Sequence, residues 1–168
     1  VVAGAGLFLE IGARLQAVSD VNPAAVKAVA AETAAPRSYL DYHELVSDPT
    51  VDAVVVMTPT KLHGEVVIAA AAAGKAIFCE KPLSLEVSEA EQMKAAVAKH
   101  GVFFQLGFMR RFDKAYAAAK KRIDAGEIGT PVVFKSSSKD QLPPPVEYLR
   151  PANSGGLFID MGIHDFDL

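Results

Sequence analysis

The sequence contains little cysteine, no cluster of basic residues and no long apolar run. A single cysteine, Cys79, excludes an intrachain disulfide framework and favours a reducing compartment. The longest apolar candidate, Val66 to Ala73, falls far short of the roughly 18 residues of a membrane helix and ends at Gly74 and Lys75. No signal peptide is recognisable, although the sequence begins with Val1. We therefore expect a cytoplasmic protein without a membrane partner.

The sequence also has no large excess of positive or negative charge. The net charge is -3 and the basic residues are scattered, so no face for nucleic acid is indicated. Apolar residues make up 51% and charged residues 22%, as in an ordinary globular protein. The 168 residues suffice for one nucleotide-binding domain and part of another.

Short β-rich apolar runs alternate with helical patterns along the first part of the chain. The predicted strands are 15–19, 51–57, 76–79 and 102–106, and the predicted helices are 22–31, 41–46, 61–73 and 84–99. This alternation predicts a mostly parallel, Rossmann-type doubly wound α/β sheet. The run Val51 to Met57 is nearly all apolar, which is typical of a strand covered on both faces. Asn22 is expected to cap the first helix, since Pro23 follows it.

The pattern changes after Gly107. We expect a dinucleotide-binding domain over residues 1–107 and the beginning of an α+β substrate and oligomerisation domain over 108–168. The second part is predicted to hold an amphipathic helix over 112–125, a strand over 132–138 and a helix over 155–168.

The first residues carry an incomplete dinucleotide-binding signature. Gly4 and Gly6 follow an apolar run, and a strand, a glycine turn and a helix N-terminus would together cradle a pyrophosphate. However, Leu9 stands where the third glycine of the usual spacing belongs. Residues 7–13 are also too few for the crossover of about a dozen residues that parallel strands need. An ordinary tight turn and a first βαβ unit that has lost a segment both remain open.

Two charged residues end predicted strands, at the edge of a parallel sheet where ligands bind. Asp20 can accept hydrogen bonds from the adenosine ribose hydroxyls, and no arginine follows it to receive a 2′-phosphate, which favours NAD. Lys81 can donate to a substrate oxygen and stabilise negative charge that develops there. The alternative for Lys81 is a surface lysine at the end of a strand.

Asp160 and His164 are four residues apart, so a helix would place them on one face. A carboxylate beside an imidazole can orient the ring and raise its basicity. A solvent-exposed pair is one alternative. A metal site with Asp165 and Asp167 is another, although Asp165 and Asp160 would point to different faces of a helix. Cys79 is interpreted as a small buried residue rather than a nucleophile.

These motifs together resemble the Gfo/Idh/MocA oxidoreductase family over nearly the whole chain. The matching segments are Gly4-Ala5-Gly6, Asp20 to Pro23, Thr58-Pro59-Thr60 with His63, Glu80-Lys81-Pro82, Gly107 to Asp113, and Ser154 to Asp167. The resemblance implies an NAD-dependent dehydrogenase that oxidises a secondary alcohol of a cyclic polyol such as myo-inositol. A dehydrogenase of another sugar, or a non-catalytic dinucleotide-binding sensor on the same fold, are the alternatives.

The resemblance also implies roles for individual residues. It assigns catalysis to Lys81, Asp160 and His164. It assigns cofactor binding to Gly4, Gly6, Asp20, Thr58, Pro59, His63, Glu80 and Lys81. It assigns substrate binding to Lys81, Arg110, Asp160, His164 and Asp167, with no metal. Arg110 and Arg111 could instead form salt bridges at the domain boundary, and His63 could cap or pack at the start of a helix.

Members of this family are much longer than the present chain. The resemblance therefore implies an amino-terminal fragment with a further deletion near Gly6, and a homo-oligomer, most simply a tetramer, for the complete protein. We expect the 168 residues alone to bind NAD weakly or not at all and to show no activity. We also expect their carboxyl-terminal third to expose apolar surface.

Overall fold

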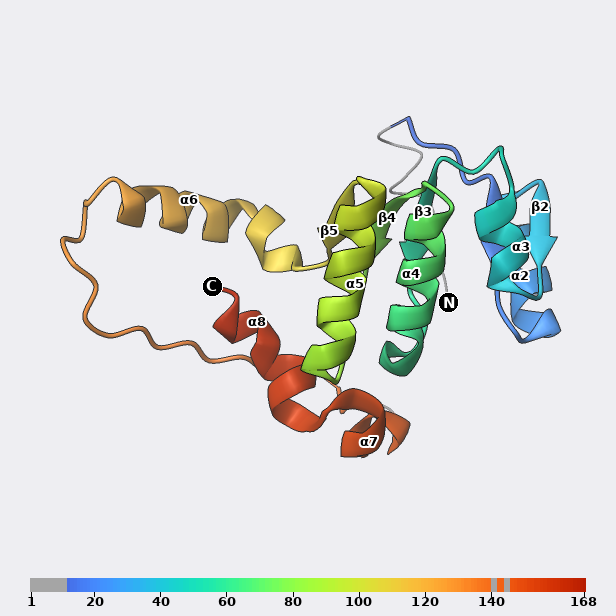
Figure 1. Ribbon diagram of the computed structural model, residues 1–168. Helices are drawn as coiled ribbons and strands as arrows, with labels where there is room; N and C mark the ends of the chain where they lie inside the picture. The colour runs from blue at the N-terminus through green and yellow to red at the C-terminus, as the bar shows by residue number, and fades with distance from the viewer. Residues whose placement is uncertain (1–11, 140–141, 144–145) are drawn as a thin grey trace.

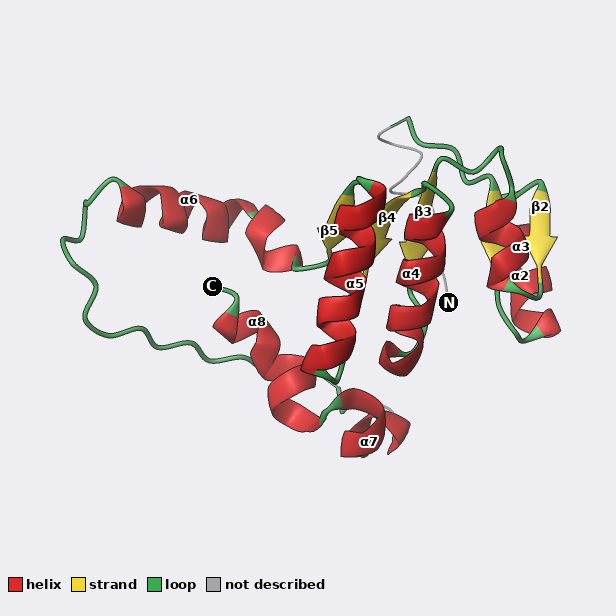
Figure 2. Cartoon of the chain, in the orientation of Figure 1, coloured by secondary structure: helices red, strands yellow, loops and turns green. Residues whose placement is uncertain are grey.

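The computed structural model describes residues 12–139, 142–143 and 146–168. Within them, parallel strands alternate with helices, so the predicted Rossmann-type α/β fold is confirmed (Figures 1 and 2). The predicted glycine signature at Gly4 and Gly6 lies outside the described residues.

The first unit is a two-stranded parallel sheet. Strand β1 (Ala17–Ser19) pairs with β2 (Arg37–Tyr39), and helix α2 (Pro23–Thr33) connects them. Asn22 caps α2 as predicted, because its side-chain oxygen accepts from the backbone N–H of Ala24 at 3.0 Å. The following short helix α3 begins one residue later than predicted, with Asp41 as its cap, and spans Tyr42–Ser47.

The second unit is a three-stranded parallel sheet in the order β3-β4-β5. Its strands are β3 (Ala53–Val56), β4 (Ala76–Cys79) and β5 (Phe104–Leu106). Helices α4 (His63–Ala72) and α5 (Val87–His100) connect the strands and lie side by side over one face of the sheet (Figure 1). A 3-10 turn, η1 (Thr60–Leu62), leads into α4.

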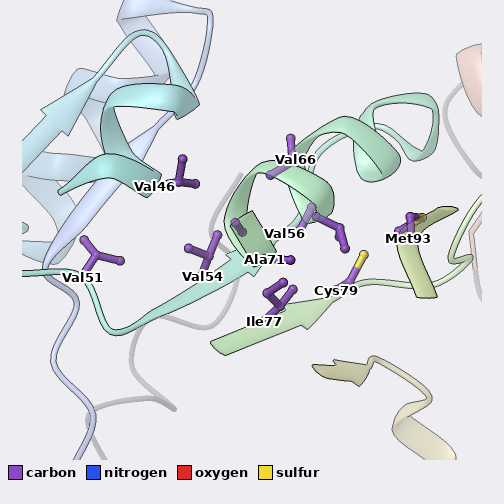
Figure 3. Packing of buried hydrophobic residues seen from close by; sticks show 11 residues of the cluster. Val46, Val51, Val54, Val56, Val66, Ala71, Ile77, Cys79 and Met93 are labelled. Carbon is purple, nitrogen blue, oxygen red and sulfur yellow. The ribbon is translucent and has the colours of Figure 1, made fainter. Parts of the chain in front are cut away.

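The apolar core lies between this sheet and its two helices (Figure 3). Val56 and Ile77 from the strands, Val67 from α4 and Met93 from α5 are each at most 1% exposed. Burying a side chain of this size contributes about 1.5–3 kcal/mol, so these contacts hold the two helices on the sheet. Val46 of α3 belongs to the same cluster, which attaches the first unit to the second.

Only one face of the second sheet is covered by the described residues. Val54 and Val56 are buried, but Val55 between them is 39% exposed. The predicted burial of both faces of this strand is therefore wrong here, because α4 and α5 pack on the same side. Nor do the described residues form one continuous sheet, since no described strand joins β1 to β3.

A buried aspartate links the two sheets on the side where β3 and β4 begin. Asp48 accepts from the backbone N–H of Thr50 at 2.9 Å and from its hydroxyl at 2.7 Å, from the hydroxyl of Tyr39 at 3.0 Å and from the guanidinium of Arg37 at 2.8 Å. These hydrogen bonds hold the pKa of Asp48 well below its usual range. Lys75 adds a bond from its ammonium to the Asp48 carbonyl oxygen at 2.8 Å. This network fixes the edge of the sheets opposite the strands' carboxyl ends.

Helix α6 (Lys114–Asp124) projects away from the sheets (Figure 1). It confirms the helix predicted over 112–125, except that Phe112 ends the preceding 3-10 turn η2 (Met109–Phe112). The strand predicted over 132–138 is wrong for this structure. These residues pair with no strand in the described part of the chain, and a β-strand is stable only when its backbone groups have a partner strand.

The helix predicted over 155–168 is confirmed over residues 156–166, but it contains a π-helical turn and ends at Phe166. A 3-10 turn, η3 (Val146–Leu149), and the short helix α7 (Pro151–Ser154) precede the turn at Gly155, which adopts a φ of +78°. A π-helical turn, η4 (Phe158–Gly162), then leads into α8 (Ile163–Phe166). A β carbon at Gly155 would lie 2.6 Å from the side chain of Ile159, so glycine alone fits this turn.

The carboxyl-terminal third exposes many large apolar side chains, as predicted. Val132 is 93% exposed, Val133 86% and Phe134 68%. No helix in the described ranges has both the length and the apolar character needed to cross a membrane.

Candidate active site

A cavity of about 270 Å³ opens where strands β3 and β4 end. The loop after each strand forms part of its wall, and Ser154 at the end of α7 and Asp160 in η4 line another side. Its lining residues are Met57, Thr58, Thr60, His63, Glu80, Lys81, Pro82, Ser154 and Asp160. The fold thus brings together residues from three motifs that are far apart in the sequence. Carboxyl ends of parallel strands are the usual place for ligands in this class of fold.

Lys81 is anchored in this cavity by Asp160. Its ammonium donates to the Asp160 carboxylate at 2.9 Å and to the Asp160 carbonyl oxygen at 2.7 Å. The two side chains are only 22% and 23% exposed, so water screens the pair less than it would on an open surface. An ammonium group has three N–H donors, and these contacts use two of them. The third can serve an oxygen of a ligand.

His164 lies near this pair in α8 but does not line the cavity itself. Its Nδ1 atom is buried and has no hydrogen-bond partner among the described residues. Burial, followed by the positive charges of Lys81 and Arg110, lowers the pKa of His164 below its usual value. The ring is therefore held in the neutral form at neutral pH, as a proton acceptor must be.

The predicted pairing of Asp160 with His164 is wrong. Asp160 directs its carboxylate to Lys81, and within the described residues no hydrogen bond joins it to His164. The physical reason is the π-helical turn over Phe158–Gly162, in which hydrogen bonds close over five residues instead of four. This turn changes the angle about the helix axis between positions 160 and 164. A spacing of four residues, which places two side chains on one face of an α-helix, therefore does not bring these two together.

Arg110 is held by a cluster of polar groups around Asp165. Its guanidinium donates to the Asp165 carboxylate at 2.5 Å and to the Ser138 hydroxyl at 2.7 Å. The hydroxyl of Ser136 also donates to Asp165, at 2.6 Å. Hydrogen bonds from Ser136, Arg110 and Ser138 lower the pKa of Asp165 to about 2. Arg110 therefore already has an ionised partner in this structure.

Arg111 makes a second ion pair, from its guanidinium to the carboxylate of Asp167 at 2.7 Å. The Asp167 side chain is only 6% exposed. These pairs correspond to the alternative of salt bridges near the domain boundary. Substrate binding by Arg110 and Asp167 stays a prediction, and it requires these pairs to be shared with a ligand.

His63 and Thr58 occupy the wall of the cavity in different ways. Both ring nitrogens of His63 lie 2.9 Å from a backbone carbonyl oxygen, that of Pro82 for Nδ1 and that of Thr58 for Nε2. The sequence indicates only capping or packing at a helix start, or contact with the cofactor, and does not reveal these two contacts. The hydroxyl of Thr58 is buried without a hydrogen-bond partner among the described residues. A buried hydroxyl of this kind indicates that a group of a bound ligand forms its hydrogen bond.

Asp20 and Cys79 lie where the sequence pattern placed them. Asp20 follows β1, and its carboxylate accepts from the backbone N–H of Asn22 at 2.8 Å, which fixes it at the strand's carboxyl end. Cys79 is fully buried in β4, and burial raises the pKa of its thiol to about 12. The thiol is therefore a packing group at this position. In the part of the chain that the structure describes, no group of three or more potential ligands could hold a metal ion.

Comparison with known proteins identifies the family. Residues 5–108 match the model of the oxidoreductase family with an NAD-binding Rossmann fold, and residues 116–168 match the GFO/IDH/MocA C-terminal domain. The chain belongs to the Gfo/Idh/MocA oxidoreductase family. Both the predicted family and its predicted cofactor, NAD, are thereby confirmed. The predicted boundary between residues 107 and 108 stays a prediction.

Curated relatives of this Gfo/Idh/MocA chain include two inositol dehydrogenases. Over 157 residues it is 47% identical to scyllo-inositol 2-dehydrogenase (NAD(+)) of Bacillus subtilis, covering 94% of the chain and 45% of the relative. It is 44% identical over 154 residues to myo-inositol 2-dehydrogenase of Thermotoga maritima, covering 92% and 46%. The chain thus spans about half the length of these relatives.

Solved structures agree with this assignment. A probable dehydrogenase from Thermotoga maritima has a TM-score of 0.88 at 43% identity, with 95% of this chain and 48% of that chain covered. Scyllo-inositol dehydrogenase from Lactobacillus casei, solved with NAD(H) and scyllo-inositol, has a TM-score of 0.79 at 35% identity, with 92% and 47% covered.

Proposed function

We propose that the complete Gfo/Idh/MocA protein containing these residues oxidises a secondary alcohol of an inositol-like cyclic polyol, with NAD as the oxidant. One observation carries this proposal. The ammonium of Lys81 is fixed by Asp160 at the carboxyl edge of the sheet, near a half-buried His164 whose Nδ1 is unpartnered among the described residues. The names of the relatives from Bacillus subtilis and Thermotoga maritima support the substrate class.

The residues around the cavity fit a dinucleotide. Thr58, whose buried hydroxyl has no partner among the described residues, and Glu80 line the space beside Lys81. Asp20 directly follows β1, where an adenosine ribose would lie. NAD supplies a hydride acceptor when it is bound. Gly4 and Gly6 complete the proposed cofactor set from outside the described residues.

The proposed chemistry divides two tasks between two residues. His164, neutral because burial and neighbouring cations lower its pKa, accepts the proton of the substrate hydroxyl. Lys81 uses its third N–H to donate to the same oxygen and stabilises the negative charge that develops on it. The carbinol hydrogen leaves as a hydride. Asp160 acts through Lys81, because it holds the ammonium where that oxygen must lie.

A dehydrogenase of another cyclic sugar is the second candidate. Levoglucosan dehydrogenase, solved with NADH and levoglucosan, has a TM-score of 0.67 at 35% identity and covers 70% of this chain. The chemistry at Lys81 and His164 would be the same, and only the pocket that selects the ring would differ. The predicted homotetramer, the cytoplasmic location, and the absence of nucleic-acid and membrane partners all stay predictions.

A substrate panel separates the candidates. The complete protein is incubated with NAD and, in turn, myo-inositol, scyllo-inositol, several aldoses and levoglucosan, and NADH absorbance is followed. We expect the highest kcat/KM with an inositol. Faster oxidation of levoglucosan or an aldose would favour the second candidate, and no NADH with any member would contradict the proposed function.

A further inference from the structure

His63 joins the two loops that carry the candidate site. It is the first residue of α4 and is only 1% exposed. Its ring lies between the carbonyl oxygen of Thr58 in the loop after β3 and that of Pro82 in the loop after β4, at 2.9 Å from each. Thr58 and Pro82 are 24 positions apart in the sequence, so the ring connects segments that the backbone does not.

The ring has no free polar atom for a cofactor or substrate. A neutral imidazole donates to one of the two carbonyl oxygens and an imidazolium donates to both, so in either state the ring holds a loop by a buried hydrogen bond. Breaking such a bond leaves a buried carbonyl group unpaired. The contacts of His63 are therefore directed at the backbone of the site.

Helix α4 provides a rigid base for these contacts. Val67, Ala70 and Ala71, on the turns after His63, are fully buried in the core against the sheet. The Pro82 carbonyl belongs to the residue that directly follows Lys81. Fixing this carbonyl therefore fixes the backbone from which the Lys81 side chain reaches Asp160.

We propose that His63 is a positioning residue for Lys81, acting through the Pro82 carbonyl, and for the Thr58 hydroxyl, acting through the Thr58 carbonyl. The kinetic part of this inference rests on the proposed dehydrogenase function. By lying between the two loops and donating to at least one of their carbonyl oxygens, the ring sets where the Lys81 ammonium meets the alcohol oxygen. A shift of about an ångström in such a group can cost on the order of a hundredfold in rate.

Three variants test this role. His63→Met has a similar side-chain length and no donor, whereas His63→Gln keeps an amide donor. His100→Met is the matched control, because His100 is an exposed histidine at the end of α5. In the complete enzyme, we expect His63→Met to lower kcat by about tenfold or more while the KM for NAD changes by less than about threefold. His63→Gln should recover most of kcat, and His100→Met should match the wild type.

Hydrogen exchange supplies a readout that needs no activity. Exchange is measured in the complete protein at the Lys81 backbone N–H, which bonds to the Glu80 carboxylate at 3.2 Å within the loop that His63 holds. We expect His63→Met to speed exchange of this amide by about tenfold, the effect of losing one buried hydrogen bond, with α5 amides unchanged. His63→Gln should stay within about threefold of the wild type.

The two readouts separate the failure of this inference from failure of the proposed function. Unchanged Lys81 exchange in His63→Met, or equal exchange in His63→Met and His63→Gln, would overturn the positioning role. The same holds if both variants have equal kcat. If the wild-type enzyme oxidises no polyol but Lys81 exchange responds as expected, the dehydrogenase proposal fails and the positioning of the loop stands.

Discussion

The ammonium of Lys81 donates to both the carboxylate and the carbonyl oxygen of Asp160, which follows it 79 positions later in the chain. The contact joins the Rossmann sheet to the turns that follow α7, and it makes one site of two distant motifs. Two donors of the ammonium are thereby occupied and directed, and one is left for chemistry. A fixed donor stabilises developing charge without having to reorganise during the reaction.

Lys81→Met should lower kcat sharply in the complete enzyme. The variant loses the donor to the alcohol oxygen, and losing one well-placed donor costs on the order of 3 kcal/mol, or about a hundredfold in rate. Steady-state oxidation of inositol measures kcat, and NAD titration should show nearly unchanged binding. Lys94→Met, an exposed lysine on α5, is the control. Near-normal turnover of Lys81→Met would show that Lys81 has no catalytic role and would support the alternative of a surface lysine at the end of a strand.

Asp160→Asn should lower the rate but leave the acidic limb of the pH–rate profile in place. Asp160 is not among the groups that set the pKa of His164, whereas the negative charge of Asp165 raises that pKa. Asp165→Asn should therefore shift the limb to lower pH, since it removes a charge that favours the imidazolium. The profile of kcat/KM for each variant tests this contrast. If Asp160→Asn shifts the acidic limb instead, the result would support a direct pairing of Asp160 with His164.

Asp20→Ser should shift cofactor preference towards NADP. The Asp20 carboxylate is fixed at the end of β1 and would repel a 2′-phosphate. Removing this like charge should raise the ratio of kcat/KM for NADP to that for NAD by at least about tenfold. Initial rates with both cofactors measure the ratio. Equal or better turnover of the wild type with NADP would argue against the role of Asp20.

The 168-residue chain should associate through its carboxyl-terminal third. Val132 and Phe134 are 93% and 68% exposed in a segment with strong β-propensity, and such surface promotes aggregation. Light scattering should show growth of large particles with protein concentration. Replacing both residues with lysine should reduce it, whereas lysine at the already polar, exposed position Ser38 should not. A monomeric wild-type chain at all concentrations would refute this expectation.

The sequence predicted the parallel α/β class because local patterns determine it. Apolar runs such as Val51 to Met57, and helices with a clear cap such as Asn22, carry their information within a few residues. The strand expected over 132–138 failed for a non-local reason, since its stability depends on a partner strand. The apolar residues of 132–138 do not indicate whether another segment provides a partner strand, and none of the described segments does.

The sequence predicted which residues lie at the candidate site but not which of them contact one another. Lys81, Asp160 and His164 all lie in or beside it, yet Asp160 pairs with Lys81 rather than with His164. The π-helical turn at Phe158–Gly162 that causes this has no distinct sequence period. The contacts of His63 with two backbone carbonyl oxygens could not be predicted either, because every residue carries a carbonyl group and no residue pattern identifies these two.

The pH–rate profile of inositol oxidation tests the central claim most directly. His164 must be neutral to accept the hydroxyl proton, and burial together with Lys81 and Arg110 lowers its pKa. Lowering the pH through that value protonates the base and reduces kcat/KM. We expect the wild type to show an acidic limb below the usual titration range of histidine, about pH 6.5, and His164→Gln to lose both this limb and about a hundredfold or more in rate. A limb of unchanged position in His164→Gln would contradict the assignment of His164 as the base.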